Sequence, residues 1–142
     1  MLRLRQDGIR CSRWDGQEHD PHCELCAGTG WAIRWQKARA IVQSAVDARF
    51  RGFMLEIATA GPVWTPPVVF FFAHTLILQP GDFVYLVEWD HDQVRDVVDV
   101  YEIRHPERLV GERGRTEYVA ATAVRQSADF AFHAGLVRGM RL

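Results

Sequence analysis

One segment restricts the fold of this chain more than any other: residues 68–78 read VVFFFAHTLIL. Apolar side chains fill both sets of alternating positions, so a strand formed here must be covered on both of its faces. A small domain rarely covers both faces of one strand by itself, and we expect part of this surface to meet another subunit. His74 interrupts the segment. Within an apolar strand, this histidine is expected to be hydrogen-bonded in a core or interface rather than to bind a ligand.

Shorter segments rich in β-branched and aromatic residues surround this strand and predict further strands. The expected strands cover residues 52–61, 83–89, 97–103 and 117–126. Residues typical of turns separate them, at QPGD (79–82), in an acidic hairpin tip (89–96) and in a hairpin within 104–118 that contains Pro106. Short strands at this spacing predict a mainly β chain, folded as a small antiparallel β-barrel or sandwich.

The length of 142 residues and the hydrophobic content of 48% suit one compact domain with small appendages. We expect a Cys-rich knuckle segment at 1–34, a β-barrel domain at 35–126 and a C-terminal arm at 127–142. The arm is either a short helix packed on its own barrel or a segment that reaches a neighbour. Residues 37–50 fit both an apolar helical face and a strand alternation, so their pattern leaves the two open.

The cysteines Cys11, Cys23 and Cys26 all lie near the start of the chain. The two-residue gap between Cys23 and Cys26 lets two thiolates face one ion, and the odd number of cysteines argues against a set of disulfides. Gly28 and Gly30 follow, which is typical of a turn that aims backbone N–H groups at sulfur and whose residues often need positive φ. We therefore predict a structural zinc bound by the three cysteines.

A structural zinc needs four ligands, and the cysteines supply three. His19 is the candidate for the fourth, because three residues separate it from Cys23 and the loop has room to return to the ion. His22 adjoins Cys23 and is expected to point away, and Asp15 and Asp20 are further alternatives. A metal-free, glycine-rich turn with three reduced cysteines is the competing interpretation.

The formal net charge of −1 comes from 17 basic and 18 acidic residues. Such a balance creates no overall basic field to attract nucleic acid. The N-terminus lacks the apolar core of a signal peptide, and no segment has the length of a membrane span. These features indicate a soluble protein that is made in a cytoplasm and has no membrane partner.

The densest polar cluster outside the knuckle comprises Glu88, Asp90, His91, Asp92 and Asp96. Carboxylates beside an imidazole can bind a metal or share a proton, but a solvated hairpin tip has the same composition. The sequence contains no Gly-rich phosphate loop, no Ser nucleophile elbow and no H-E-x-x-H helix. We therefore predict no catalytic residues and no enzymatic activity.

Four short motifs in order resemble those of a known family. They are C-x2-C-x-G-T-G before an aromatic residue (Cys23–Trp31), L-x-P-G-D (Leu78–Asp82), Y-x-I (Tyr101–Ile103) and G-R-x-E-Y (Gly114–Tyr118). In this order they resemble the small neck proteins of tailed bacteriophages and phage-like gene transfer particles. The chain departs from the family's C-P-x-C pattern at CSRW, where Trp14 stands at the position of the second cysteine.

The resemblance implies a structural protein of the virion, at the head–tail neck. Such a head-closure or head-to-tail connector subunit assembles as a homo-oligomeric ring beneath the portal and adaptor and receives the tail or tail-terminator proteins. DNA passes through the ring without specific binding, and a zinc clip shapes a docking surface. The resemblance also favours a strand at 37–50 and assigns the acidic tip at 89–96 to the lumen or to a subunit contact.

Two other classes of function remain open on the residues alone. A zinc-ribbon nucleic-acid-binding module would use the locally basic N-terminal third of the chain, with its arginines on either side of the cysteines. A metal-dependent hydrolase built on the acidic tip would require a second, non-cysteine metal site.

Overall fold

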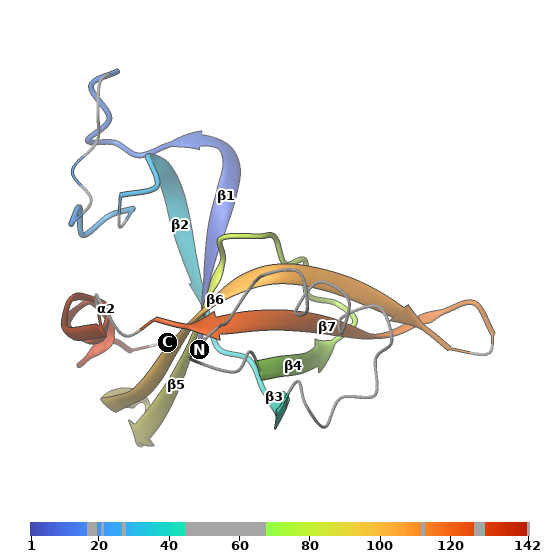
Figure 1. Ribbon diagram of the computed structural model, residues 1–142. Helices are drawn as coiled ribbons and strands as arrows, with labels where there is room; N and C mark the ends of the chain where they lie inside the picture. The colour runs from blue at the N-terminus through green and yellow to red at the C-terminus, as the bar shows by residue number, and fades with distance from the viewer. Residues whose placement is uncertain are drawn as a thin grey trace, which may run out of the picture. The chain divides into compact units, whose positions relative to one another are not determined.

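The computed structural model describes residues 1–16, 20, 22–26, 28–44, 68–111, 113–126 and 130–141. Within this part of the chain seven strands and one helix are seen (Figure 1). The elements are β1 (Leu2–Arg10), β2 (Trp31–Gln36), β3 (Ala40–Ser44), β4 (Val68–Ala73), β5 (Phe83–Asp90), β6 (Gln93–Val110), β7 (Thr116–Arg125) and α2 (Phe130–Val137). The mainly β, antiparallel prediction is confirmed, and so is the short C-terminal helix.

The strand order is β2-β1-β5-β6-β7-β4-β3, and β2 and β3 stand at its ends. The sheet is therefore open rather than closed into a barrel. Two compact units share it. The first unit comprises Met1–Lys37, Asp82–Val100 and Gln126–Leu142, and the second comprises Ala38–Gly81 and Tyr101–Arg125. The long strand β6 contributes its first half to one unit and its second half to the other. The expected division at 1–34, 35–126 and 127–142 stays a prediction.

The first unit has an apolar core built from Met1, β5, the start of β6 and α2. Its buried members are Met1, Tyr85, Val94, Val97, Val100, Ala134 and Val137. Since Ala134 and Val137 belong to α2, the helix packs on its own chain. Antiparallel pairing joins β1 to β2 from Leu2↔Gln36 to Arg10↔Trp31, and this hairpin holds the cysteine loop. Neither β1 nor β2 was expected from the sequence.

The second unit places β4 between β3 and β7, so both edges of this strand are paired, and side chains cover each of its faces. On one face Val69 packs with Ala120, Phe71 and Leu109. On the other, Phe70 stacks on Phe72 and meets the Tyr101 ring at 5.2 Å between centroids. Val69, Phe70 and Phe72 are buried within the single chain. The expected subunit contact for this strand therefore stays a prediction.

The strand predicted at 68–78 ends at Ala73, so its second half was wrongly assigned. The chain turns at His74, which is exposed instead of lying in a core, and the Leu76 N–H donates to the Ala73 carbonyl. The reversal lets the predicted turn at 79–82 return to the sheet, where the Gly81 N–H donates to the Ile103 carbonyl at 2.8 Å. Gly81 has φ +87°, a conformation that suits glycine.

Two further strand boundaries differ from expectation. β6 runs through Pro106, which the sequence placed in a hairpin loop; a register shift between Ile103 and His105 marks an irregularity beside it, where a residue without an N–H is tolerated. In the ambiguous 37–50 segment, β3 confirms a strand at Ala40–Ser44. Residues 37–39 precede this strand, whereas residues 45–50 and the strand expected at 52–61 lie outside the described residues. No helix in the described part of the chain is long and apolar enough to cross a membrane.

Candidate metal centre

Residues 11–30, here called the knuckle loop, connect β1 to β2 (Figure 1). The strand pair Arg10↔Trp31 closes the loop at its base, and the Cys11 N–H donates to the Gly30 carbonyl at 3.0 Å. A loop of this length has little apolar material of its own. Its described core consists of the three cysteines with Trp14 packed against them.

The three predicted cysteine ligands meet in this loop. Cys11, Cys23 and Cys26 are buried, and their sulfur atoms all lie within 4.8 Å of one another. The Cys11 and Cys23 sulfurs are 4.0 Å apart, well beyond the ~2.05 Å of a disulfide bond. Tetrahedral zinc with Zn–S bonds of ~2.3 Å holds its sulfurs about 3.8 Å apart. The sulfur positions therefore fit a tetrahedral metal ion, and these residues could hold one.

Local hydrogen bonds shape the turn that contains Cys23 and Cys26. The Cys26 N–H donates to the Cys23 carbonyl at 3.3 Å, and the Thr29 hydroxyl donates to the Cys26 carbonyl at 2.8 Å. Gly28 has φ +78° and Gly30 has φ +69°, as the glycine spacing led us to expect. The sequence pattern thus encodes the turn itself.

Burial raises the pKa of the Cys26 thiol to about 11. Backbone hydrogen bonds from Gly30 and Gly28 act in the opposite direction and favour the thiolate, whereas the neighbouring thiols of Cys23 and Cys11 raise the pKa further. The Cys26 thiol is therefore protonated at neutral pH unless a cation joins it. A bound metal supplies that charge and holds the cysteines as thiolates.

Trp14 covers the cysteine cluster from the side of Gly30. A Cβ atom at Gly30 would lie 2.8 Å from the Trp14 ring, so only glycine permits this packing. The Arg10 guanidinium lies over the Trp31 ring at 3.9 Å and near the Trp14 ring at 5.0 Å. The arginine thereby links the loop to the strands at its base through cation–π contacts.

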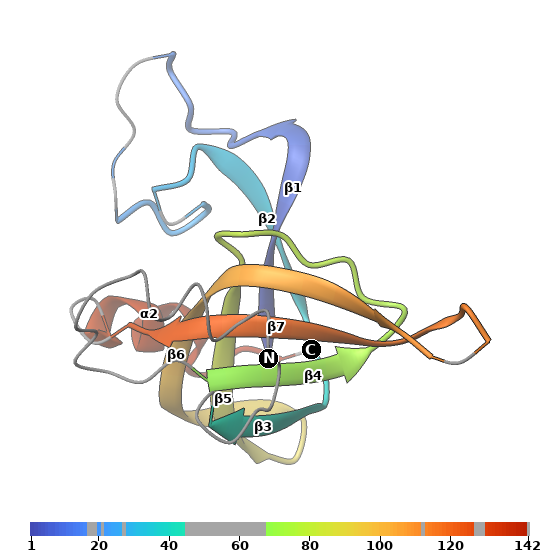
Figure 2. The same cartoon turned by 45° about the vertical axis from the view of Figure 1, so that its right-hand side comes forward.

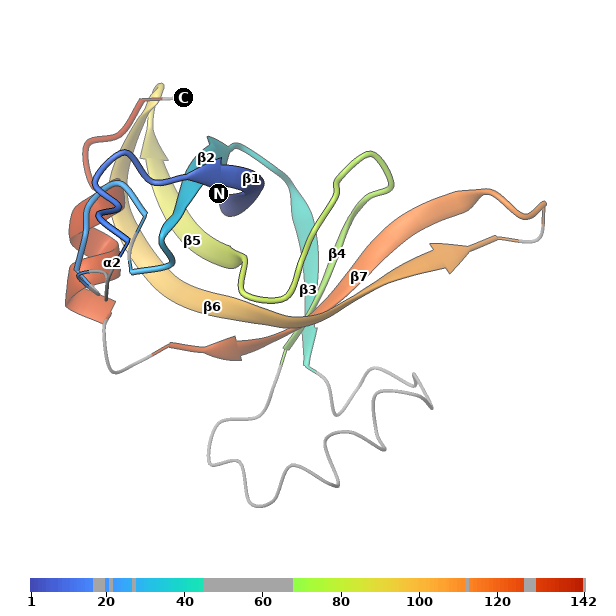
Figure 3. The ribbon, with the colours of Figure 1, turned by 90° about the horizontal axis from the view of Figure 1, so that it is seen from above.

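The fourth predicted ligand, His19, lies outside the described residues. His22 is described, and its ring meets the edge of Phe132 in α2 at 4.9 Å between centroids. The ribbon of the loop accordingly runs beside α2 (Figure 3). His22 does not join the cysteine group, in agreement with the expectation that it points away. Among the residues that the structure describes, the three cysteines form the one group of metal-binding side chains.

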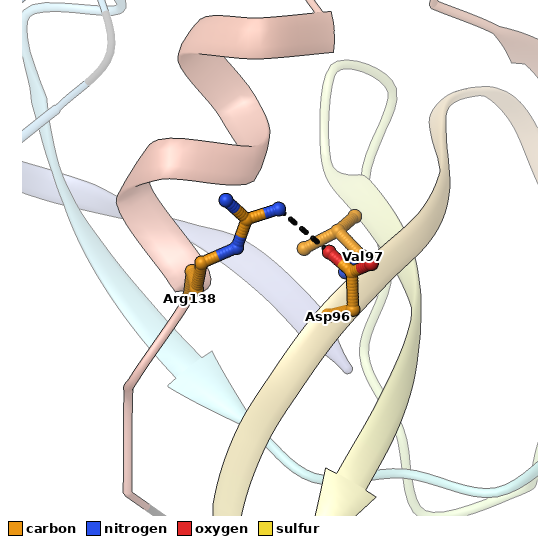
Figure 4. Close-up of polar contacts among 3 residues, drawn as sticks. All are labelled: Asp96, Val97 and Arg138. Carbon is orange, nitrogen blue, oxygen red and sulfur yellow. Dashed lines mark hydrogen bonds and ion pairs between the residues drawn. The ribbon is translucent and has the colours of Figure 1, made fainter.

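The acidic tip is a tight hairpin turn at His91 and Asp92, between β5 and β6. His91 has φ +55°, and its Nδ1 atom lies 2.8 Å from a carboxylate oxygen of Asp90; both side chains are exposed. Asp96 instead accepts a hydrogen bond from Arg138 at 2.7 Å and one from the Val97 N–H at 2.9 Å (Figure 4). These bonds hold the pKa of Asp96 below its ordinary value. The acidic residues therefore do not form one site. Asp90 and His91 lie at a surface turn, whereas Asp96 forms an ion pair with Arg138, directly after α2.

A buried polar contact at the apolar core of the first unit, between Tyr85 and His133, was not expected from the sequence. The Tyr85 hydroxyl lies 3.0 Å from Nδ1 of His133, a residue whose partner sequence reasoning did not find. Burial raises the pKa of Tyr85 to about 12, although the Arg3 guanidinium, which also lies over the Phe83 ring at 3.9 Å, acts against this shift. Nothing in the local sequence signals this group, because its members come from β1, β5 and α2.

Comparison with known proteins finds no family model, no curated protein and no solved structure that matches this chain. The function must therefore be argued from the residues themselves.

Proposed function

We propose that this chain is a structural subunit of the head–tail junction of a tailed bacteriophage or a phage-like gene transfer particle. It would act as a head-closure or connector subunit in a ring between the portal or adaptor and the tail. The observation that carries the proposal is the ordered set of four motifs, each of which occupies a defined loop, turn or strand. They form the knuckle loop, the turn before β5, the middle of β6 and the turn that opens β7.

The open strand order supports assembly into a ring. β2 pairs with β1 and β3 with β4, and each stands at one end of the order, so each has a free edge among the described strands. On β3 the side chains of Ile41 and Val42 are exposed. Exposed edges with apolar side chains pair readily with a strand of another chain. In a ring the neighbouring subunit would provide that strand.

The metal in the knuckle loop is, in this proposal, a structural zinc. Three buried thiolates form a donor set that zinc prefers, and the loop has no larger core of its own to hold it in shape. Metal binding would supply the folding free energy of this segment. The ordered loop would then provide a fixed docking surface for the next layer of the neck.

His19 is proposed as the fourth ligand, and Trp14 offers a test of it. The Trp14 N–H donates to the Cys11 carbonyl at 2.9 Å, just as the Cys26 N–H donates to the Cys23 carbonyl. Trp14 therefore occupies the place on the first turn that Cys26 occupies on the second. His19→Ala should weaken zinc binding, the His22→Ala control should not, and Trp14→Cys should restore binding in the His19→Ala background. Unchanged affinity in His19→Ala would remove this residue from the ligand set.

Native mass spectrometry of the purified chain tests the proposed function through subunit number and bound metal together. We expect one zinc per chain and a closed ring, formed alone or with the portal–adaptor complex of its particle. Ile41→Lys, which places a charge on the β3 edge, should give folded monomers. A chain that stays monomeric in both settings would contradict the connector role. Two metals per chain would favour a hydrolase, and DNA affinity that depends on the knuckle arginines would favour a nucleic-acid module.

A further inference from the structure

The hairpin of β6 and β7 extends beyond the rest of the second unit's sheet. Pairing of β4 with β7 ends at Ala73↔Tyr118, whereas pairing of β6 with β7 continues to Val110↔Thr116 (Figure 2). At the tip, the Gly111 N–H donates to the Arg115 carbonyl at 2.9 Å. The last part of the hairpin is therefore a two-stranded finger, which we call the hairpin end (residues 108–118).

An open hollow of about 1340 Å³ is lined by residues of this finger, including its tip, and by Ala73 and His74 at the end of β4. Its chemically distinctive lining residues are His74, Arg108, Arg113, Arg115, Glu117 and Tyr118. Three arginines against one glutamate leave a formal charge of +2 with the histidine neutral. The nearly neutral chain therefore concentrates positive charge at one place, although its overall charge predicts no attraction to polyanions.

The three arginines are exposed, and none forms an ion pair with a carboxylate among the described residues. Elsewhere in the chain arginines do pair, as Arg104 does with Glu102 at 2.9 Å. The Glu117 side chain packs against Gly111 at the base of the tip, where an added Cβ would overlap its carboxylate. Three like charges beside a single carboxylate of the lining repel one another, and a bound polyanion relieves that repulsion.

We propose that this hollow binds the phosphate backbone of nucleic acid without regard to sequence. Guanidinium groups match phosphate oxygens with paired hydrogen bonds, and the half-exposed Tyr118 ring offers a surface on which an unpaired base can stack. Small-molecule pockets measure roughly 300–1,000 Å³, and this wider, open hollow suits a segment of polymer better than a metabolite. The inference goes beyond the connector role and does not depend on it.

The test is fluorescence anisotropy of the full chain with a labelled DNA duplex and with its single strands over a series of salt concentrations. The variant Arg108→Gln/Arg113→Gln/Arg115→Gln should lose at least about tenfold in affinity near 0.1 M salt and reduce the slope of log K against log salt by about 2 to 3. The matched control, Arg13→Gln/Arg34→Gln/Arg95→Gln, removes the same charge from exposed positions of the first unit and should change both far less. Circular dichroism should show both variants folded, since all six side chains are exposed.

Tyr118→Leu separates base stacking from charge. It should weaken binding of single strands about tenfold and leave duplex binding nearly unchanged, because paired bases are not available to the ring. Equal losses in the two arginine variants, or no DNA binding by the wild-type chain at low salt, would overturn the proposal. Displacement of the DNA by polyglutamate at equal charge concentration would also overturn it, since the hollow would then fit an acidic protein segment.

Discussion

The knuckle loop and the apolar core of the first unit differ in the side chains that build them. The loop's described core is three cysteines and one tryptophan. The other core joins seven buried residues, Met1 and members of β5, β6 and α2, with further half-buried aromatic and aliphatic side chains around them. Apolar burial stabilises the core in proportion to its area, whereas in our proposal the loop depends on a bound metal ion. The two regions should therefore fail under different conditions.

Removing the metal should produce the largest effect, and it should be confined to the loop. Structural zinc sites contribute on the order of 10 kcal/mol to the folding of small metal-bound segments. With a strong chelator, or in Cys26→Ser, we expect amide protection to disappear in residues 11–30 and to persist in β5. Hydrogen exchange read by mass spectrometry measures both at once. Loss of protection throughout the first unit would show that the loop and the core are one cooperative structure.

Tyr85→Ala should do the reverse. The side chain is fully buried, and truncating a large aromatic residue in a core costs about 3–5 kcal/mol. Urea unfolding should show this loss, while zinc stoichiometry stays at one per chain under folding conditions. Tyr85→Phe is the matched control, because it removes only the hydroxyl, with its contacts to His133 and Arg3, and should cost about 1 kcal/mol. A similar cost for both variants would mean that the polar contact, rather than apolar packing, stabilises this core.

Gly30→Ala should affect the loop through shape instead of metal ligation. Alanine at φ +69° costs about 1–2 kcal/mol, and its Cβ would also push the Trp14 ring from its position. Gly16→Ala shares the positive φ, at +90°, but meets no atom within 4 Å. Thermal unfolding and Trp14 fluorescence should therefore report a larger change for Gly30→Ala. Equal changes in the two variants would remove the packing argument.

The Asp96–Arg138 ion pair should give the smallest effect, since both side chains are solvent-exposed. Because the folded protein lowers the pKa of Asp96, the pair stabilises above the ordinary value of 3.8 and loses its contribution as the pH falls through the lower, folded-state value. Asp96→Asn should thus destabilise the chain slightly at neutral pH and not in strong acid. Parallel urea titrations of wild type and variant at the two pH values measure this. A difference that grows in acid would have the wrong sign for this pair.

Local patterns in the sequence determined the parts of the structure that depend on neighbouring residues. The spacing of Cys23, Cys26, Gly28 and Gly30 predicts a turn with positive φ, and the turn is there because only glycine adopts that backbone without strain. The turn at 79–82 and the strands β5 and β7 follow from residue preferences in the same way. Cysteine count and spacing likewise indicated a shared site, whose three sulfurs the fold brings together.

The tertiary structure alone decided which distant residues meet. Trp14 covers the cysteines because β1 and β2 pair and bring Gly30 beneath its ring, and neither strand carries a pattern strong enough to predict. The contacts of Arg3, Tyr85 and His133 join three elements far apart in the chain, so no window of sequence contains them. The end of β4 at Ala73 was set by the return of the chain to pair with β6. The periodicity of apolar residues indicates which side chains become buried. The pairing of distant segments determines which residues cover them.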